Sequence, residues 1–496
     1  MNAPHAIVIG SGIAGLAVAT RLSVQGYRVT VYEANDYPGG KLSAFSDGGY
    51  HFDAGPSLFT QPENVEDLFK MAGEPIEAYF SYEPVDIACN YFFENGKRVK
   101  AYTDKSAFAG ELAEQLGETA TAVPEYLDRA EKLYNSTGTV FLNHSLHRKS
   151  TWLHPRILKA LKTVRLPYLT GTLDQYNRSR FRSPEAVQLF NRYATYNGSN
   201  PFKAPGMLSL IPHLEQNTGT FYPRGGMISI TNALYKLALK KGVTFHFGTR
   251  VERIIHHETS VKGVVVNGKN QDADIVVSNA DIYFTYKHLL KHEPKARKVL
   301  KQERSSSALI FYWGINRSFP ALGLHNILFS KNYKEEFDHL FNRKTLYNDP
   351  TIYINITSKH EPAHAPSGAE NWFVMVNAPA NYGQSWDEIA IKARAYVIEK
   401  INRILNTDIE QAIAVEHKLD PVLIEERTGS FMGSLYGTSS NSKLAAFLRP
   451  ANDTSYIRGL YFCGGTVHPG GGIPLCLKSA QIAADLIHTD NRTKKH

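Results

Sequence analysis

The stretch from His5 to Glu33, HAIVIGSGIAGLAVATRLSVQGYRVTVYE, decides the fold. Its first five residues are typical of a buried parallel strand, residues 16–25 of a helix, and residues 28–32 of a second strand. Between the first strand and the helix lies the turn Gly10-Ser11-Gly12-Ile13-Ala14-Gly15, which has the glycine spacing of a dinucleotide-binding site. The order strand, glycine-rich turn, helix and strand predicts a parallel α/β sheet.

Each glycine of this turn has a physical role toward a pyrophosphate. Gly10 makes the tight turn, Gly12 removes a Cβ where the backbone approaches the phosphates, and Gly15 lets the helix pack closely on the sheet. The phosphates then lie at the helix N-terminus, where free N–H groups and the helix dipole favour negative charge. Glu33 stands where the fold places the acid that binds a ribose hydroxyl, and an acid there disfavours a 2′-phosphate. The sequence therefore favours FAD or NAD over NADP.

Length, net charge and cysteine content limit the kind of protein that this sequence can be. The 496 residues, 43% of them hydrophobic, allow two or three domains with a large core. The net charge of +8 is mild for this length, so no nucleic-acid partner is expected, and an anionic membrane surface would fit equally well. Three cysteines without metal-type spacing predict no metal site and no disulfide framework, which favours a reducing cytoplasm. We expect neither a signal peptide nor a run of roughly 18 apolar residues that could span a bilayer.

Two further glycine-bearing turns follow Glu33 and favour FAD over NAD. They are Gly39-Gly40-Lys41 and Gly55-Pro56-Ser57, and they stand where an NAD-binding domain would continue into its third strand and helix. Small residues and backbone amides allow close approach by a flat or phosphorylated ligand, and Lys41 can meet a phosphate as a point charge. Either turn alone would be interpreted as an ordinary surface turn.

The C-terminal part of the chain repeats the pattern. The strand-like segment Leu460–Cys463 runs into the glycine-rich turn Gly464–Pro474, and residues 475–487 have the spacing of a helix. A strand, a glycine-rich turn and a helix N-terminus suit an anion or the polar edge of a ring. Asn279, near the end of another strand-like segment at 274–281, stands where open α/β sheets bind ligands. An ordinary polar turn residue is an equally good interpretation of Asn279.

Taken together, these motifs resemble the carotenoid desaturase family, within the larger flavin amine oxidase and phytoene desaturase superfamily. The resemblance spans the whole chain in order, and the turn around His468-Pro469-Gly470 is its part most specific to carotenoid enzymes. It implies FAD held non-covalently. The motifs that carry it are Gly10–Gly15, Glu33, Gly39–Lys41, Gly55–Ser57, Tyr222–Met227 and Gly464–Pro474.

The resemblance also implies roles for single residues. Ala14 and its neighbours would hold the pyrophosphate, Glu33 the adenosine ribose, and the backbone of Val251 the adenine. Lys41 stands where the family usually has an arginine. Pro56 and Ser57 would lie near the isoalloxazine.

The ribityl chain and flavin edge would be lined by Gly465 and by Gly472-Ile473. Many relatives in the superfamily place an aspartate where this sequence has Gly464-Gly465, so backbone amides would have to serve. The complete predicted cofactor set is Gly10, Gly12, Ala14, Gly15, Glu33, Gly40, Lys41, Pro56, Ser57, Val251, Asn279, Gly465, Gly472 and Ile473.

The expected fold class is α/β, with a Rossmann-type FAD-binding domain, an inserted sheet-plus-helix substrate domain and a helical membrane-facing region. Because the flavin motifs lie in separate pieces, the substrate domain must be inserted twice. The expected boundaries are 1–75, 220–290 and 425–496 for the FAD-binding domain, 76–145 and 291–424 for the substrate domain, and 146–219 for the helical region.

Residues 149–166 are a candidate membrane contact. Five basic residues alternate at helical spacing with apolar ones, and Trp152 stands near the start, as in a helix that lies in a bilayer interface. From the residues alone, a surface helix packed on the core is the favoured interpretation. The resemblance shifts the balance, because the family's long polyene substrates reside in membranes. The expected location is cytoplasmic, peripheral to the inner face of a membrane.

The chemistry implied by the resemblance is the removal of a hydride and a proton from a C–C single bond, with the flavin as hydride acceptor. The sequence contains no nucleophile motif or catalytic dyad, so the catalytic residues stay unknown. His468 could be an acid or base, but a role in bracing its turn is favoured. The terminal electron acceptor, oxygen or a quinone, is left open.

Four functions stay open. Residues 465–470 and 372–379 look closer to 3,4-desaturases that act on hydroxylated carotenoid ends than to phytoene desaturases. The alternatives are the phytoene desaturase itself and a carotenoid isomerase that uses reduced flavin without net redox change. A prenyl-protein chaperone without flavin is the fourth, and the intact pyrophosphate turn with Glu33 argues against it.

Overall fold

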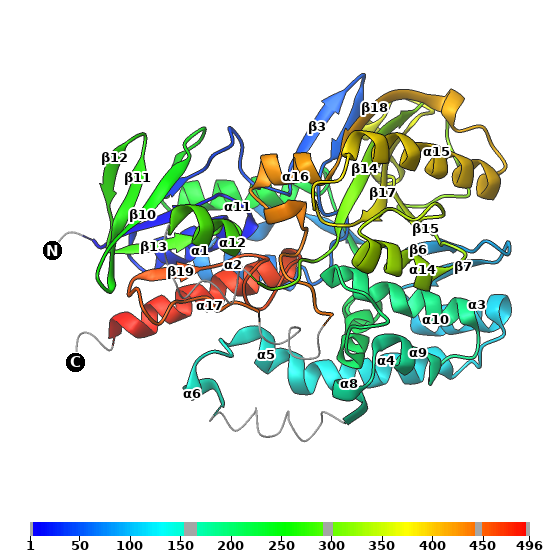
Figure 1. Cartoon of the computed structure of the whole chain (residues 1–496), viewed down its shortest axis with the longest axis horizontal. Coiled ribbons are helices and arrows are strands. Elements are labelled where there is room, and N and C mark those ends of the chain that lie inside the picture. Colours follow the sequence, from blue (N-terminus) through cyan, green and yellow to red (C-terminus); the bar gives the residue numbers. More distant parts are fainter. Residues whose placement is uncertain (1–2, 153–165, 291–300, 442–448, 493–496) are drawn as a thin grey trace.

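The computed structural model describes residues 3–152, 166–290, 301–441 and 449–492. Figure 1 shows two lobes side by side, with a group of helices beneath the second lobe. The first lobe holds a parallel sheet with helices, and the second holds a larger mixed sheet. Within the described ranges, no helix is both long and apolar enough to cross a membrane.

The first lobe is built on a five-stranded sheet in the order β19-β13-β1-β2-β9, with all strands parallel. Three distant parts of the chain supply its strands, so the sheet cannot form until they meet. The strands are β1 (His5–Ile9), β2 (Arg28–Tyr32), β9 (Thr244–His246), β13 (Ile275–Ser278) and β19 (Leu460–Phe462). Apart from the exposed edge strand β9, each strand is mostly buried and largely apolar, as expected where both faces of a parallel sheet are covered.

Helices cover one face of this sheet. Helix α1 (Ile13–Val24) is buried along nearly its whole length, because it packs between the sheet and the helices α2 (Glu63–Ala72), α11 (Ile228–Lys240) and α17 (Ile473–Arg492). The other face is covered by the small antiparallel sheet of β10 (Val251–His257), β11 (Ser260–Val266) and β12 (Lys269–Asp272).

Two helix starts differ from the sequence prediction. Helix α1 begins at Ile13 rather than at residue 16, because the glycine turn itself winds into the first helical turn. Helix α17 begins at Ile473 rather than at residue 475, since Pro474 is tolerated in a first turn, where its missing N–H would have no intrahelical partner.

Asp53 joins β4 (Tyr50–Asp53), the partner of β3 (Ala44–Asp47), to the start of α11. Its buried carboxylate accepts hydrogen bonds from the backbone N–H of Met227, at 2.8 Å, and of Ile228, at 3.1 Å. Two of the helix's first N–H groups are thereby satisfied by a residue from another element. The sequence alone gave Asp53 no role.

The second lobe is built on a seven-stranded sheet in the order β18-β14-β17-β16-β15-β6-β7. Its two longest strands, β14 and β17, are paired antiparallel along their whole length. The bounds are β6 (Ile87–Phe92), β7 (Arg98–Tyr102), β14 (Ser307–Ile315), β15 (His325–Leu328), β16 (Ile352–Asn355), β17 (Glu370–Ala378) and β18 (Ile413–Leu419).

The two faces of this sheet have different partners. Helix α15 (Trp386–Leu405) packs on the face that carries Trp313, Trp372 and Ile352. Because side chains alternate along a strand, Tyr353 and Met375 lie on the opposite face, which is turned toward β4 and the loop that follows it.

Short helices cover the β6–β7 end of the sheet and form the lower right of Figure 1. Of the aromatic residues Phe190, Tyr193, Tyr196 and Phe202, the first two are buried in this core and the other two pack against it. The helices of this group are α3 (Lys105–Leu116), α4 (Ala122–Leu133), α8 (Leu166–Thr170), α9 (Leu173–Arg178), α10 (Pro184–Asn191) and α14 (Tyr333–Asp338). Helix α5 (Thr139–Asn143) contacts α17 instead, and α6 (Lys149–Trp152) follows it. The remaining elements are β5 (Tyr82–Pro84), which pairs with β8 (Phe221–Pro223), α12 (Ile282–Phe284) and α16 (Pro421–Thr428).

A buried ion pair lies inside this helical core. The Arg192 guanidinium donates to Glu215 at 2.5 Å and to the hydroxyl of Tyr91 at 2.6 Å, while Tyr193 and Tyr196 donate to the same carboxylate. Burial alone would lower the pKa of Arg192, but Glu215 and the tyrosines raise it well above its ordinary value. The pair is therefore charged and fully hydrogen-bonded.

Replacing Arg192 with Met should destabilise the protein by about 3–5 kcal/mol, because the Glu215 charge is then left buried without its partner. The free energy of unfolding in denaturant, followed by circular dichroism, measures the loss. The matched control is Arg178→Met, since Arg178 is 61% exposed and pairs with Asp174 at 2.8 Å. That exposed pair should contribute less than about 1 kcal/mol. Equal losses of unfolding free energy in the two variants would show that the buried pair contributes no more than the exposed one.

Candidate functional site

The first two glycine turns lie against each other at the end of β1. Gly10 has a φ of +93°, in the region that favours glycine, and Gly12 forms a parallel bridge with Gly39. The Gly39 N–H donates to the carbonyl oxygen of Ser11 at 2.9 Å. A Cβ on Gly40 would lie 3.5 Å from the Gly12 Cα atom. The structure thus brings Gly10, Gly12 and Gly40 together, as the sequence predicted.

Asn279 lies between two glycine-rich turns. Its backbone N–H donates to the Ile9 carbonyl at 2.8 Å, and its side-chain amide donates to the Cys463 carbonyl at 3.2 Å. A Cβ on Gly12 would come within 2.8 Å of the Asn279 side-chain oxygen, and one on Gly464 within 2.6 Å of its nitrogen. The amide therefore occupies the space that the missing side chains leave, which gives these glycines a packing role beside any role toward a ligand.

The N-terminus of α1 is open for an anion. The N-cap residue is Gly12, and no side chain caps the helix, so its first N–H groups are not satisfied by a capping side chain. Gly15 fits directly beneath the turn, because a Cβ there would lie 2.1 Å from the Gly10 carbonyl oxygen. Ala14 is buried in the first turn. This arrangement suits a pyrophosphate.

Glu33 is buried at the end of β2, with its carboxylate turned back to the first turn. Its oxygens accept from the Ser11 N–H at 2.6 Å, the Ser11 hydroxyl at 2.9 Å and the Asn35 N–H at 2.9 Å. A carboxylate has about four acceptor positions, so one remains for a ribose hydroxyl. The Thr249 N–H donates to the Glu33 carbonyl at 2.7 Å, which places Val251, at the start of β10, beside the same strand end.

The ammonium group of Lys41, which the sequence predicts to meet a phosphate, contacts the protein's own backbone. It donates to the Leu435 carbonyl at 2.9 Å, so it ties the second turn to a segment far along the chain. Burial lowers the pKa of Lys41 and raises the pKa of Asp281, the acid that attracts it electrostatically. Arg304 is the stronger electrostatic partner of Asp281.

The third turn joins the cofactor lobe to the large sheet. A Cβ on Gly55 would lie 1.7 Å from the Lys41 carbonyl oxygen, so the two turns touch through their backbones. Pro56 is exposed, and the Ser57 hydroxyl lies 2.7 Å from the hydroxyl of Tyr353 on β16.

The C-terminal turn leaves an open side. Gly472 is exposed, has a φ of +103°, and has no atom within 4 Å of the position that a Cβ would occupy. Gly465 is partly exposed, and Ile473 is buried at the start of α17. Replacement of Gly472 would strain the backbone even without a ligand.

Arg449 lies beneath this turn and was missed by sequence reasoning. It donates to the carbonyl oxygens of Tyr436, at 2.7 Å, and Gly465, at 3.2 Å, and among the described residues its Nη2 atom has no hydrogen-bond partner. Burial lowers the pKa of Arg449 to about 10. A lone arginine gives no sequence signal, but a buried guanidinium without a paired carboxylate suits an anionic ligand. An open helix N-terminus, a ribose-type acid and Arg449 together fit a dinucleotide.

The comparisons with known proteins agree with this geometry. The family model described as flavin-containing amine oxidoreductase matches residues 13–488. The chain is 51% identical, over 98% of its length and 99% of the relative's, to a 1-hydroxycarotenoid 3,4-desaturase of Flavobacterium sp. (strain P99-3).

The chain belongs to the flavin-containing amine oxidoreductase family. It is 31% identical, with 98% of both chains covered, to a 4,4'-diaponeurosporene oxygenase of Staphylococcus aureus (strain MSSA476). The solved structure of cyclohexylamine oxidase from Brevibacterium oxydans IH-35A matches 99% of this chain and all of its own, with a TM-score of 0.63 and 17% identity, which bears on the fold alone. The expected α/β flavoprotein fold and FAD as the cofactor of this oxidoreductase are thereby confirmed.

Hydrogen bonds at both its ring and its backbone hold His468 in place, as expected of a residue that stabilises its turn. It is buried, one ring nitrogen lies 3.0 Å from the His144 carbonyl oxygen, and its own carbonyl oxygen accepts from Asn452 and Ser479. Burial, assisted by the nearby His147, lowers the pKa of His468 to about 4. The geometry supports the bracing interpretation.

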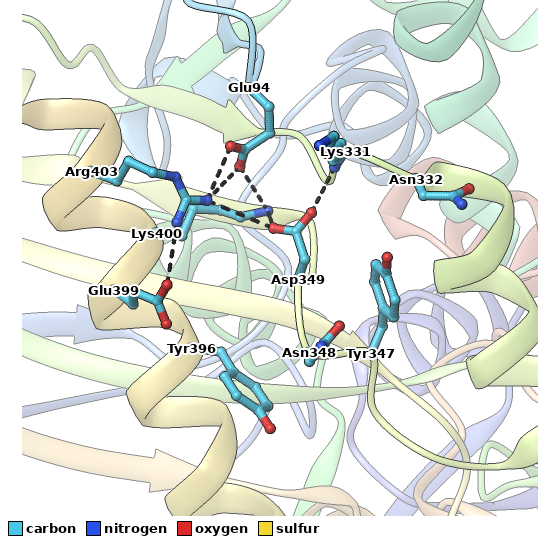
Figure 2. A pocket seen from close by; sticks show the side chains of 10 residues that line it. All are labelled: Glu94, Lys331, Asn332, Tyr347, Asn348, Asp349, Tyr396, Glu399, Lys400 and Arg403. Carbon is cyan, nitrogen blue, oxygen red and sulfur yellow. Dashed lines mark hydrogen bonds and ion pairs between the residues drawn. The ribbon is translucent and has the colours of Figure 1, made fainter.

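A charged pocket lies away from the FAD-binding turns, next to α15 on the outer side of the large sheet. It has a volume of about 780 Å³. In Figure 2, Lys400 lies between Glu94 and Asp349, and its ammonium is 2.5 Å from Asp349. Arg403 pairs with Glu94 and Glu399 nearby. With Lys331, which also lines the pocket, three positive and three negative side chains meet there. Among the described residues, no cluster of His, Cys, Asp and Glu has the make-up of a metal site.

Acid should destabilise this flavoprotein through His468. Because its folded pKa of about 4 lies below the ordinary 6.5, the unfolded chain binds the proton more tightly, and stability falls as the pH drops from 6.5 toward 4. This difference between the folded and the ordinary pKa corresponds to a loss of roughly 3 kcal/mol of stability once the pH is below 4. His468→Asn should flatten the dependence of the melting temperature on pH between 7 and 5, whereas exposed His257→Asn should not. Parallel profiles for wild type and His468→Asn would contradict this.

Proposed function

We propose that the protein is an FAD-dependent desaturase that introduces a C=C bond into an acyclic or monocyclic carotenoid, by 3,4-desaturation of a 1-hydroxylated end. The observation that carries the proposal is the 51% identity, over nearly the full length of both chains, to the Flavobacterium 1-hydroxycarotenoid 3,4-desaturase. The intact FAD-binding geometry around Gly12, Glu33 and Arg449 supports it.

The protein's own contribution is to bind the polyene and to hold it against the cofactor. FAD supplies the hydride acceptor for oxidation of the C–C bond. Tyr353, Met375 and Asn377 share one face of the large sheet, and each is partly exposed although its strand neighbours are buried. A largely apolar face with partly exposed side chains suits a polyene, which needs apolar contact along its length and few polar groups to fix its position.

Anaerobic mixing of the oxidised enzyme with a 1-hydroxylated acyclic carotenoid should bleach the flavin absorbance. The polyene absorbance should shift to longer wavelength at the same time, because a new double bond extends the conjugated system. Stopped-flow spectroscopy records both changes, and mass spectrometry should show the loss of two hydrogens. A product of unchanged mass, formed only after the flavin has been reduced, would replace the desaturase with the isomerase.

We further propose that the protein associates with a membrane surface on its cytoplasmic side, where its substrate and a quinone acceptor would dissolve; oxygen is the other acceptor. Residues 153–165 of the predicted amphipathic helix lie outside the described residues. The described ends support the proposal, because Trp152 on α6 is 44% exposed and Leu169 on α8 is 39% exposed. Exposed aromatic and apolar side chains beside basic residues are typical of interfacial contacts.

Replacing Lys159, Lys162 and Arg165 with Glu should weaken binding to anionic liposomes by at least about 100-fold, since each basic residue contributes about 1 kcal/mol near such a surface. Liposome co-sedimentation measures the affinity, and flavin content checks the fold. The matched control reverses three exposed lysines elsewhere, Lys262, Lys269 and Lys392, for the same change in net charge. Equal binding by the two variants would disprove a local membrane contact.

A further inference from the structure

A chain of hydrogen bonds crosses the sheet face that lies opposite to α15. The hydroxyl of Tyr353 on β16 lies 2.7 Å from the Ser57 hydroxyl on one side and 2.7 Å from the Nδ1 atom of His325 on the other. The strand register places Tyr353 between Ile327 and Met375. Polar groups on an apolar face lose water, so a chain of them at this place calls for an explanation.

The hydrogen bonds around His325 fix the direction of the whole chain. The Asn355 Nδ2 atom donates to the Leu324 carbonyl oxygen at 3.0 Å and lies 3.2 Å from His325 Nδ1, so this ring nitrogen is an acceptor. Burial lowers the pKa of His325 to about 3, so the ring is neutral, and with Nδ1 as the acceptor for Asn355 its hydrogen is on Nε2. Tyr353 therefore donates to His325, and Ser57 must donate its only hydrogen to Tyr353.

As a result, the Ser57 oxygen has only lone pairs left to offer. It can accept a hydrogen bond but cannot donate another one. A ligand that contacts Ser57 through a polar group must therefore bring a donor, such as an O–H group.

Ser57 also lies where the two lobes meet. Two residues before it, Gly55 touches the backbone of Lys41, whose turn is bridged to Gly12 at the start of α1. On its other side Ser57 reaches Tyr353, which borders the partly exposed positions on the sheet face. A group bound at Ser57 is thus close to both the cofactor turns and the sheet.

We propose that the Ser57 oxygen accepts a hydrogen bond from the hydroxyl on C1 of the carotenoid, and that Tyr353 and His325 are positioning residues that fix its polarity. The inference rests on the proposed function. The C1 oxygen is three bonds from C3, within roughly 4 Å at ordinary bond lengths. A fixed hydroxyl therefore determines which C–C bond meets the flavin, as hydride transfer over about 3–3.5 Å requires.

A substrate without the hydroxyl would press C–H groups against the Ser57 lone pairs and would leave them unsatisfied. An unsatisfied buried polar group of this kind reduces transition-state binding by about 10- to 100-fold. Ser57 would thereby select hydroxylated ends over plain hydrocarbon ends.

The test compares kcat/KM for a 1-hydroxylated acyclic carotenoid and for the same polyene without the hydroxyl. In Ser57→Ala the ratio of the two values should fall by about 10- to 100-fold, through loss on the hydroxylated substrate alone. Ser57→Thr keeps an acceptor and should keep the wild-type ratio. Ser46→Ala, in the exposed β3, is the matched control and should change neither value.

A second variant tests the positioning role. Tyr353→Phe removes the group that takes the Ser57 hydrogen, so the ratio should fall although Ser57 is still present. The affinity for the hydroxylated product, measured through flavin fluorescence, should fall with it, while flavin content stays at the wild-type value. This readout does not depend on turnover.

The possible failures are distinguishable. If wild-type protein desaturates the hydroxylated carotenoid but Ser57→Ala keeps the wild-type ratio, the inference is wrong and the proposed function stands. If Ser57→Ala lowers both values equally, Ser57 serves the cofactor or the fold, and the inference is again wrong. If wild-type protein desaturates neither polyene, the proposed function itself fails.

Discussion

The packing of Asn279 between two glycine-rich turns is the contact on which the cofactor lobe depends. Asn279 directly follows β13. This strand pairs with β1, from the N-terminal stretch, on one side and with β19, from the C-terminal one, on the other. The Asn279 amide hydrogen-bonds to Cys463 and occupies the space beside Gly12 and Gly464, so the two turns can come together only because both lack a side chain. Two turns more than 450 residues apart in the chain are thereby fixed beside each other by close packing of the backbone.

A few close contacts also connect the cofactor lobe to the large sheet. Lys41 reaches the Leu435 carbonyl, Gly55 touches the backbone of Lys41, and Ser57 reaches Tyr353. The first and third contacts join elements that are far apart in the chain, and none of the three allows much sliding, because one partner is always backbone or a ring carried by a strand. The lobe that binds FAD and the large sheet are thereby held in a fixed relation, as hydride transfer over a few ångströms demands.

How much the sequence could predict depends on how far apart in the chain the interacting residues lie. The strand, turn and helix from His5 to Val24 are decided by residues close in the chain, so periodicity and glycine spacing were sufficient for them. The grouping of Gly10, Gly12 and Gly40 follows from the motif. By contrast, the partner of Lys41 lies 394 residues away, and no local pattern could identify it. The alignment of Tyr353 with His325 depends on strand register, which a single sequence does not contain.

Buried polar groups in the described chain differ in whether the protein's own contacts satisfy them. Arg192 and Glu215 complete each other, because every strong donor and acceptor between them is used, and such a pair holds helices without a need for any ligand. Arg449 beneath the C-terminal turn and His325 at the end of the Ser57 chain each keep a buried nitrogen without a partner among the described residues. A protein keeps such groups at a free-energy cost, and that cost is offset where a ligand supplies the missing partner. Arg449 lies beneath the C-terminal glycine-rich turn and His325 at the end of the Ser57 chain, so each stands beside a place for which we have proposed a ligand. The completed pair lies in the helical core, where the contacts of the chain itself are sufficient.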